Sequence, residues 1–383
     1  MNLRKSTILV TCAKGIVPVL REEIIALSFP VLSEKPAGVE TAGTFDDAMK
    51  LNLHIRSGQR VLYFLTEFAA RDADELYAGL SQFPWEEYLY DDGYVSVASS
   101  VDNPTIRDPR YANLKGKDAI VDRINGQCGR RPNSGPDSDK AVIYFHWKGT
   151  HCRVYADTSG EPLSRRGYHV HPMDAPMQES LAAGVVLATG WRDDGFFVNP
   201  MCGSGTLAIE AALLAIGRAP GSFRTNYGFM HLKCFERPVW EAMREQARKT
   251  ERKDAKYRIV ATDINPAAIE AARKNAKRAG VDHLIDFSVC DYADTPIPEG
   301  GGVVVINPEY GRRQGIEKEL KTVYWSIGNF LKRKCQGYTG FVFTGNLELA
   351  RNIGLRPGRR LLFYNGQIEC RLIEFELFRR PAG

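Results

Sequence analysis

A glycine-rich turn at residues 201–206 offers the first recognisable chemistry in this 383-residue sequence. It follows the short apolar run Phe196–Val198, and a helical pattern begins at Thr206. A strand, a glycine turn and a helix in that order are typical of the opening unit of a nucleotide-binding α/β sheet. Gly203 and Gly205 let the backbone approach a ligand closely, and the helix N-terminus supplies free N–H groups. The turn has neither the Gly-Lys-Ser/Thr of a P-loop nor a GxGxxG fingerprint, so alone it fits a ligand loop or an ordinary tight turn.

Polar side chains at the ends of four expected strands favour the ligand loop. Asn199 and Asn307 each follow a short apolar run, and Asp263 and Asp291 end two further runs. In an open α/β sheet, ligands bind beyond the carboxyl ends of the strands. One such aspartate is as often a helix cap as a ligand-binding residue, but four such ends predict a single site.

The two stretches around Gly203 and Asn307 resemble motifs of S-adenosylmethionine-dependent methyltransferases that act on exocyclic amino groups. The usual forms of these motifs are close to Asp-Pro-Phe-Cys-Gly-Ser-Gly-Thr and Asn-Pro-Pro-Tyr. Over essentially the whole chain, the sequence is similar to the THUMP-domain methyltransferases that modify guanine N2 in large-subunit ribosomal RNA, a group once labelled DNA adenine methylases. Segments 175–179, 219–224, 345–349 and 353–357 carry further resemblance.

The resemblance implies a site for S-adenosylmethionine at the glycine turn. The turn would wrap the methionine part of the cofactor, Asp263 would accept both ribose hydroxyls, and Asp291 would receive the adenine amino group. The residues expected around the cofactor are Asn199, Met201, Cys202, Gly203, Gly205, Thr206, Asp263, Ile264, Asp291 and Tyr292.

The resemblance also implies how an amino group would be held. The Asn307 side-chain oxygen and the Pro308 carbonyl would accept the two amine hydrogens, and Tyr310 would stack on the base. The base must be unpaired or flipped out of a helix, and orientation and charge complementarity, without a covalent nucleophile, would drive transfer. The expected catalytic residues are Asn307, Pro308, Glu309 and Tyr310.

Two residues depart from the usual motifs. Glu309 replaces the second proline and adds a carboxylate beside the target amine, which would either accept a hydrogen bond from guanine or weaken catalysis. Asn199 replaces the usual acid of the first motif and loses a charge that would face the cofactor amino group. Neither change removes Asn307, Pro308 or Tyr310, so we expect an active enzyme.

The order of expected elements predicts an α/β protein, and the resemblance implies that it has three regions. Residues 1–55 are expected to form a ferredoxin-like subdomain, residues 56–168 a THUMP RNA-binding domain, and residues 169–383 the methyltransferase domain. In the last region, alternating strands and helices predict a Rossmann-like parallel sheet. Asn365-Gly366 predicts an antiparallel hairpin at its end. Residues 218–256 are expected to form a long, charged, partly helical insertion.

Basic residues predict contacts with structured RNA. Each one alone is more often a solvated surface charge, but as a set beside tyrosines they favour a phosphate backbone. The candidates are Lys115, Lys117, Arg130, Arg131, Arg165, Arg166, Arg312 and Arg313.

Composition limits the class of protein. The formal net charge of +5 only mildly favours a nucleic-acid partner. No apolar run approaches the roughly 20 residues that span a bilayer, and the first residues lack a signal-peptide pattern. Eight cysteines without CxxC pairing indicate reduced thiols, and His169 and His171 lack a third ligand, so we expect a cytoplasmic protein without metal or membrane.

Three functions fit these observations. The leading hypothesis is methylation of guanine N2 in large-subunit rRNA. The second is adenine-N6 methylation of DNA or RNA, because the Asn-Pro-x-Tyr motif serves both amines. The third is a catalytically silent RNA-binding or ribosome assembly factor, which the departures at Glu309 and Asn199 would support.

Overall fold

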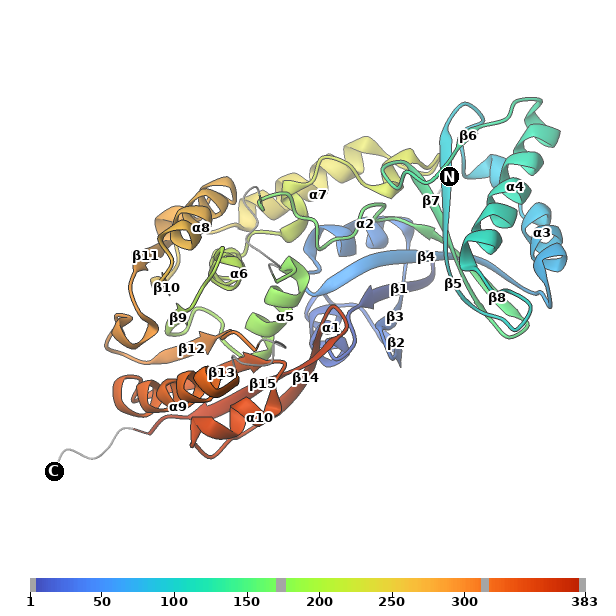
Figure 1. Cartoon of the computed structure of the whole chain (residues 1–383). Helices are drawn as coiled ribbons and strands as arrows, with labels where there is room; N and C mark the ends of the chain where they lie inside the picture. The colour runs from blue at the N-terminus through green and yellow to red at the C-terminus, as the bar shows by residue number, and fades with distance from the viewer. Residues whose placement is uncertain (1–4, 170–176, 311–316, 379–383) are drawn as a thin grey trace. The chain divides into compact units, whose positions relative to one another are not determined.

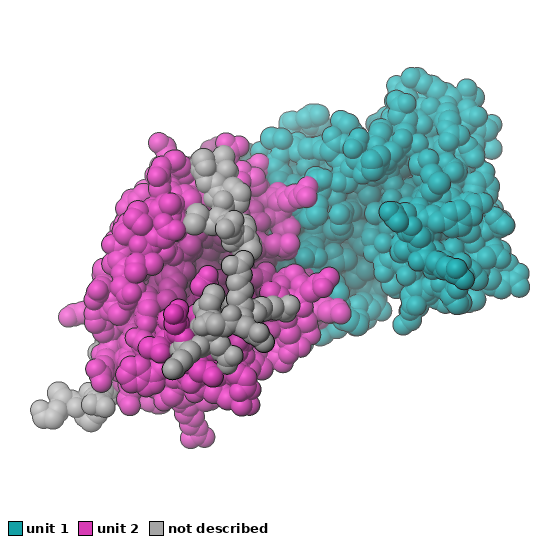
Figure 2. Space-filling view, in the orientation of Figure 1, with its two compact units in different colours: residues 1–12, 21–163, 224–246 teal, residues 13–20, 164–223, 247–383 magenta. Residues whose placement is uncertain are grey.

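A computed structural model of the chain describes residues 5–169, 177–310 and 317–378 (Figure 1). These residues form two compact units, coloured separately in Figure 2. Unit 1 consists of residues 1–12, 21–163 and 224–246. Unit 2 consists of residues 13–20, 164–223 and 247–383.

Unit 1 contains an eight-stranded sheet in the order β2-β3-β1-β4-β8-β7-β5-β6. Its strands are β1 (Ser6–Cys12), β2 (Val31–Lys35), β3 (Gly38–Gly43), β4 (Gly58–Ala69), β5 (Tyr94–Asp102), β6 (Asn133–Ser134), β7 (Ala141–Lys148) and β8 (His151–Asp157). The twelve-residue strand β4 is central, because its first half pairs with β1 and its second half pairs with β8. The strands β7 and β8 form an antiparallel hairpin across residues 148–150.

The helices of this region are α1 (Val17–Ala26), α2 (Phe45–His54), α3 (Ala73–Gln82), α4 (Pro109–Cys128) and the short η1 (Trp85–Glu87) and η3 (Gly228–His231). Side chains cap α2, α3 and α4. Thr44 and Asp47 form a capping box at α2, and Asp72 caps α3. Asp108 caps α4, and Pro109 is the first residue of this helix. Figure 1 shows α3 and α4 side by side.

Residues 224–246 belong to unit 1, although they lie between elements of unit 2 in the sequence. The backbone N–H of Phe229 donates to the Thr158 carbonyl at 3.0 Å, and that of Lys233 donates to the Tyr88 carbonyl at 2.9 Å. The buried Tyr227 ring stacks on Phe229 with 4.9 Å between ring centroids. The long insertion that the sequence predicted therefore supplies part of the core of unit 1.

Unit 2 contains a seven-stranded sheet in the order β11-β10-β9-β12-β13-β15-β14. Its strands are β9 (Phe196–Pro200), β10 (Ile259–Asp263), β11 (Ile285–Val289), β12 (Gly302–Ile306), β13 (Tyr338–Thr344), β14 (Arg360–Asn365) and β15 (Ile368–Glu376). The five strands from β11 to β13 in this order are parallel, whereas β15 pairs antiparallel with both β13 and β14. The predicted parallel sheet with a C-terminal hairpin is confirmed.

Helices cover both faces of this sheet, with α9 and α10 on one face and α5, α6 and α8 on the other (Figure 1). The helices are α5 (Glu179–Ala188), α6 (Thr206–Ala215), α8 (Pro266–Arg278), α9 (Glu317–Lys334) and α10 (Leu347–Ala350), with short η2 (Pro220–Phe223), η4 (Asp282–Leu284), η5 (Tyr292–Asp294) and η6 (Arg351–Ile353). The helix α7 (Arg237–Thr250) contains the boundary between units at residues 246 and 247. Tyr324, Ile327 and Leu331 of α9 form one core cluster with strand residues such as Val304 and Val342.

Candidate cofactor and amine site

The glycine turn connects β9 to α6 through left-handed backbone conformations. Met201, Gly203 and Gly205 have φ angles of 56°, 57° and 84°. A Cβ at Gly205 would lie 2.9 Å from the Cβ of Ala272, so this glycine lets α6 approach α8. A Cβ at Gly203 would meet no atom of the described residues within 4 Å. The side of Gly203 that lacks a side chain is therefore open to a ligand.

Asp263, at the end of β10, ties this turn to the neighbouring strand. Its Oδ2 accepts the N–H of Gly203 at 2.9 Å, and its Oδ1 accepts the N–H of Asn265 at 2.9 Å. The N–H of Cys202 donates to the Thr262 carbonyl at 2.9 Å. Since each carboxylate oxygen has two lone pairs, Asp263 keeps acceptor capacity for a bound hydroxyl. Asn265 caps α8 as the sequence predicted.

The end of β11 lies beside the end of β10. The N–H of Cys290 donates to the Asp263 carbonyl at 3.1 Å, and the Asp291 carboxylate accepts the N–H of Ala293 at 2.8 Å. Tyr292 is partly buried, with its ring edge-to-face against Phe330. Ile264 follows Asp263 and is 68% exposed. These residues put two carboxylates, an apolar side chain and an aromatic ring at one edge of the sheet.

Asn199 and Asn307 each hold a buried side-chain oxygen with no hydrogen-bond partner among the described residues. The Nδ2 of Asn199 donates to the Val305 carbonyl at 2.8 Å, which joins β9 to the adjacent strand β12 just before Asn307. An unpaired buried acceptor costs roughly 1–3 kcal/mol, so such an atom in a native protein requires an explanation. A ligand with N–H donors would satisfy both oxygens.

The segment after β12 presents the second motif. Asn307 and Tyr310 are partly buried, Pro308 is buried and Glu309 is exposed. The Tyr310 hydroxyl accepts a hydrogen bond from Asn365 Nδ2 at 2.9 Å, and burial raises the pKa of this phenol. The sequence predicted the hairpin at Asn365 but not this contact, because an Asn-Gly pair is sufficiently explained as a turn.

Gly345, which follows β13, also helps to position the Tyr310 ring. A Cβ at this position would lie 3.0 Å from Cδ2 of Tyr310, so only a glycine lets the ring approach this backbone. The ring is therefore held between the turn after β13 and the tip of the β14–β15 hairpin.

A polar side chain also holds the helix that follows the glycine turn. Glu210 is the one charged residue of α6 and is buried. Its Oε2 accepts from Arg166 Nη1 at 2.6 Å and its Oε1 accepts from the Tyr168 hydroxyl at 2.7 Å. Burial raises the pKa of Tyr168 above its ordinary value, so the phenol remains a donor. A lone glutamate in an apolar helix was a signal for this network that the sequence interpretation did not use.

His169 links the same region to Thr206. Its Nε2 lies 3.1 Å from Thr206 Oγ1, and its Nδ1 lies 3.3 Å from a carboxylate oxygen of Glu179. The structural role favoured for this histidine fits these contacts, whereas His171 lies outside the described residues. Within the described ranges, no group of three potential metal ligands occurs.

The expected RNA-binding residues that the structure describes differ in their burial and in their ion pairs. Four belong to unit 1 and form ion pairs with carboxylates: Lys115 with Asp74, Lys117 with Asp118, Arg130 with Asp92, and Arg131 with Asp122. Arg165 is exposed, but the buried Arg166 is paired with Glu210 and does not reach a phosphate. Arg312 and Arg313 lie outside the described residues.

Comparisons with known proteins decide the family. Residues 166–374 match the RMKL-like methyltransferase domain, residues 7–62 the RlmL ferredoxin-like domain, and residues 70–157 the THUMP domain. The chain belongs to the RMKL-like methyltransferase family. The predicted family is confirmed.

Relatives and solved structures agree with this family. The chain is 38% identical over 379 residues to ribosomal RNA large subunit methyltransferase K/L of Syntrophotalea carbinolica, covering 96% of this chain and 53% of that protein. It is 31% identical over 368 residues to "Putative RNA methyltransferase slr0064" of Synechocystis, covering 96% of each chain. The chain thus spans about half the length of the K/L relatives.

Two crystal structures match nearly the whole chain. One is "SMU.472, a putative methyltransferase complexed with SAH", with a TM-score of 0.89, 27% identity, and coverage of 99% of this chain and 100% of that chain. The other is "a predicted N6-adenine-specific DNA methylase" from Listeria monocytogenes, with a TM-score of 0.87, 28% identity, and coverage of 98% and 97%. No helix among the described residues is long and apolar enough to cross a membrane.

Proposed function

We propose that this chain methylates the N2 amino group of guanine in large-subunit ribosomal RNA, using S-adenosylmethionine. The observation that carries the proposal is the buried Asn307 side-chain oxygen, which has no partner among the described residues. Asn307 follows β12 and precedes Tyr310, whose ring is held in place, by three residues. The K/L relatives by name and the THUMP match support RNA as the substrate. A cytoplasmic location and the division at residues 55/56 and 168/169 belong to the same proposal.

The residues at the strand ends fit the cofactor, which supplies the methyl group when bound. The open side of Gly203 would accommodate its amino-acid part, and the unpaired Asn199 oxygen offers an acceptor to an ammonium group. Asp263 retains acceptor capacity for ribose hydroxyls, and Asp291 would accept from the adenine amino group. Met201, Cys202, Gly205, Thr206, Ile264 and Tyr292 complete the proposed cofactor site.

The second motif would orient the target amine. Asn307 Oδ1 and the Pro308 carbonyl would accept its two hydrogens and turn the nitrogen lone pair toward the methyl group. The held Tyr310 ring would stack on the base, a contact worth about 1–3 kcal/mol. The exposed Glu309 carboxylate would accept the guanine N1–H, which would distinguish guanine from adenine. After transfer, the nitrogen would release one proton to solvent.

Labelled methyl transfer with nucleoside analysis tests the proposal. The substrates are deproteinised large-subunit rRNA from cells lacking this gene, assembled subunits, and genomic DNA. We expect N2-methylguanosine from rRNA, and we expect Asn307→Ala to lower kcat at least about 100-fold, as for loss of a transition-state hydrogen bond. Calorimetry with S-adenosylhomocysteine is the control, since the variant should bind it like wild type.

Other products would replace the proposal with one of its alternatives. Label in N6-methyladenine would keep the amine mechanism and change the substrate, in line with the name of the Listeria structure. Bound S-adenosylhomocysteine without transfer to any nucleic acid would indicate a catalytically silent RNA-binding or ribosome assembly factor.

A further inference from the structure

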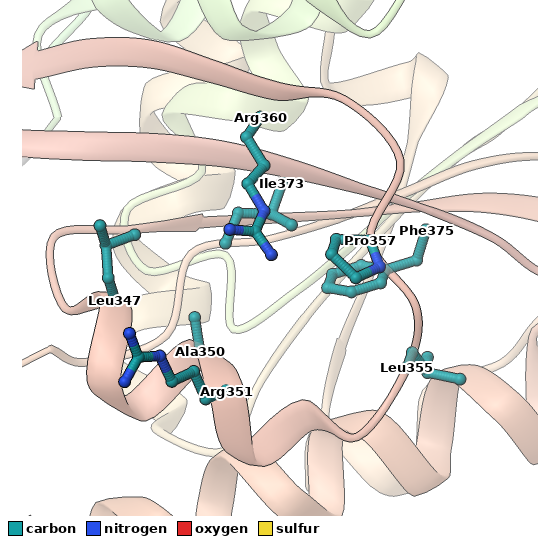
Figure 3. Close-up of a pocket in the computed structure, with 8 residues that line it drawn as sticks. All are labelled: Leu347, Ala350, Arg351, Leu355, Pro357, Arg360, Ile373 and Phe375. Atoms are coloured by element: carbon teal, nitrogen blue, oxygen red, sulfur yellow. The ribbon is translucent and has the colours of Figure 1, made fainter.

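A groove in unit 2 lies between the α10–η6 segment and the β14–β15 hairpin (Figure 3). Its volume is about 280 Å³. Apolar side chains line much of it, and two arginine side chains reach into it. The residues on which the inference depends are Leu347, Arg351, Leu355, Pro357 and Arg360.

The groove is cationic. The Arg360 side chain is exposed and has no ion-pair or hydrogen-bond partner among the residues described. Arg351 pairs with Glu348 at 2.9 Å, but both side chains of this pair are mostly exposed, so solvent weakens the interaction. Arg356, in the turn that forms one end of the groove, is also exposed. An anionic partner would gain from at least one unopposed guanidinium.

Both walls of the groove lead to Tyr310. On one wall, Gly345 lies against the Tyr310 ring and α10 begins two residues later. On the other wall, β14 begins at Arg360 and ends at Asn365, which donates to the Tyr310 hydroxyl. Five residues of strand span about 17 Å, so the groove lies one or a few nucleotides away from the base that Tyr310 would hold.

We infer that this groove binds a nucleotide of single-stranded RNA that flanks the target base. The base and ribose would lie on Leu355 and Pro357, which are only partly buried, and Arg360, with Arg351, would bind the phosphate. Unpaired RNA is commonly recognised by apolar or guanidinium surfaces for the base together with cations for the backbone. The inference rests on the proposed function, because that function supplies the RNA. The contact in the groove is separate from the contacts that Asn307, Pro308 and Tyr310 would make with the target base.

Charge reversal at Arg360 tests the groove. Binding of a fluorescein-labelled single-stranded RNA of mixed sequence is measured for wild type and Arg360→Glu over a series of salt concentrations. We expect Arg360→Glu to weaken binding about tenfold and to reduce the slope of log K against log salt by about 0.7, one phosphate contact. Arg360→Lys should restore most of the slope, because it restores the charge.

Arg333→Glu is the matched control. Arg333 is exposed in the last turn of α9, and its replacement by glutamate changes the net charge by the same amount as Arg360→Glu. It should weaken binding less than twofold, and both variants should bind S-adenosylhomocysteine like wild type. Equal effects of Arg360→Glu and Arg333→Glu would overturn the groove and leave the proposed function intact. Wild-type protein that neither binds nor methylates RNA would overturn both. Loss of a protein partner in Arg360→Glu, with unchanged RNA affinity, would show that the groove binds protein.

Discussion

Gly203 and Gly205 in the cofactor turn are glycines for different physical reasons. Replacing each one by alanine should therefore lower the free energy of unfolding by different amounts. Gly205→Ala places a methyl group against Ala272 at a φ of 84°, so we expect a loss of about 3 kcal/mol in the free energy of unfolding. Gly203→Ala meets no protein atom, so its cost should be only the left-handed backbone, about 1–2 kcal/mol. Urea unfolding measures both.

Gly203→Ala should also lower the affinity for the cofactor. The new methyl group in Gly203→Ala would occupy the open side of the turn, so S-adenosylhomocysteine affinity measured by calorimetry should fall at least tenfold. A Gly203→Ala protein that binds the cofactor normally would show that the open side faces something else.

His54 should make stability depend on pH. Burial, with Lys50 and Arg56 nearby, lowers its pKa from 6.5 to about 4, although its place in the last turn of α2 would favour the charged form. In the unfolded chain it protonates near pH 6.5, so falling pH stabilises the unfolded state first. The stabilisation is full above pH 6.5 and is lost as pH falls toward 4, by up to about 3 kcal/mol.

The variant His54→Gln isolates this contribution from the carboxylates that titrate in the same range. Urea unfolding of both proteins at several pH values should show the wild type losing more stability than the variant between pH 6.5 and 4. Parallel curves would mean that His54 protonates equally well in the folded protein.

At the scale of elements, α6 is anchored by a buried charge. Glu210→Gln would leave the buried Arg166 guanidinium without its carboxylate, and breaking a buried pair typically costs 3–5 kcal/mol. Thermal and urea unfolding should show a loss of this size. The matched control is Glu270→Gln on α8, whose ion pair with Lys274 is exposed and should contribute less than about 1 kcal/mol. Similar losses in the two variants would contradict the anchoring role.

The sequence predicted elements whose ends are marked by capping or turn residues. Asn265 and Pro266 mark the start of α8, and Asn365-Gly366 marks the hairpin, because capping and turn chemistry depend on a few adjacent residues. The buried state of Arg166 was not predictable, since an arginine beside Arg165 has the same local pattern whether it faces RNA or a glutamate 44 residues away.

The same limit applies to larger segments and to the site. Residues 224–246 join unit 1 through backbone contacts such as Phe229 with Thr158, and no local pattern encodes such a partner. The motifs located Asn199 and Asn307, but their unpaired oxygens become visible only once the surrounding atoms are placed.

At the scale of the molecule, the proposed cofactor residues belong to unit 2, whereas four of the eight expected RNA-binding residues, Arg131 among them, belong to unit 1. Arg131→Glu should therefore weaken RNA binding several-fold and reduce the salt slope by about one, without changing cofactor affinity. Arg21→Glu is the control, because its side chain is 45% exposed against 49% for Arg131, and both form ion pairs. Equal RNA affinities in the two variants would remove Arg131 from the RNA surface.

The strand β4 limits how the two regions of unit 1 can be exchanged in evolution, because both regions use it. Its twelve residues complete the ferredoxin-like strands at one end and the THUMP strands at the other. A chain divided at residue 56 would leave β1 without its neighbour β4 and would expose the edges of both strands, and such open edges promote association between chains. A gene exchange that replaced either region alone would have to bring a strand fitting both neighbours. The two regions are therefore expected to pass through evolution as one piece.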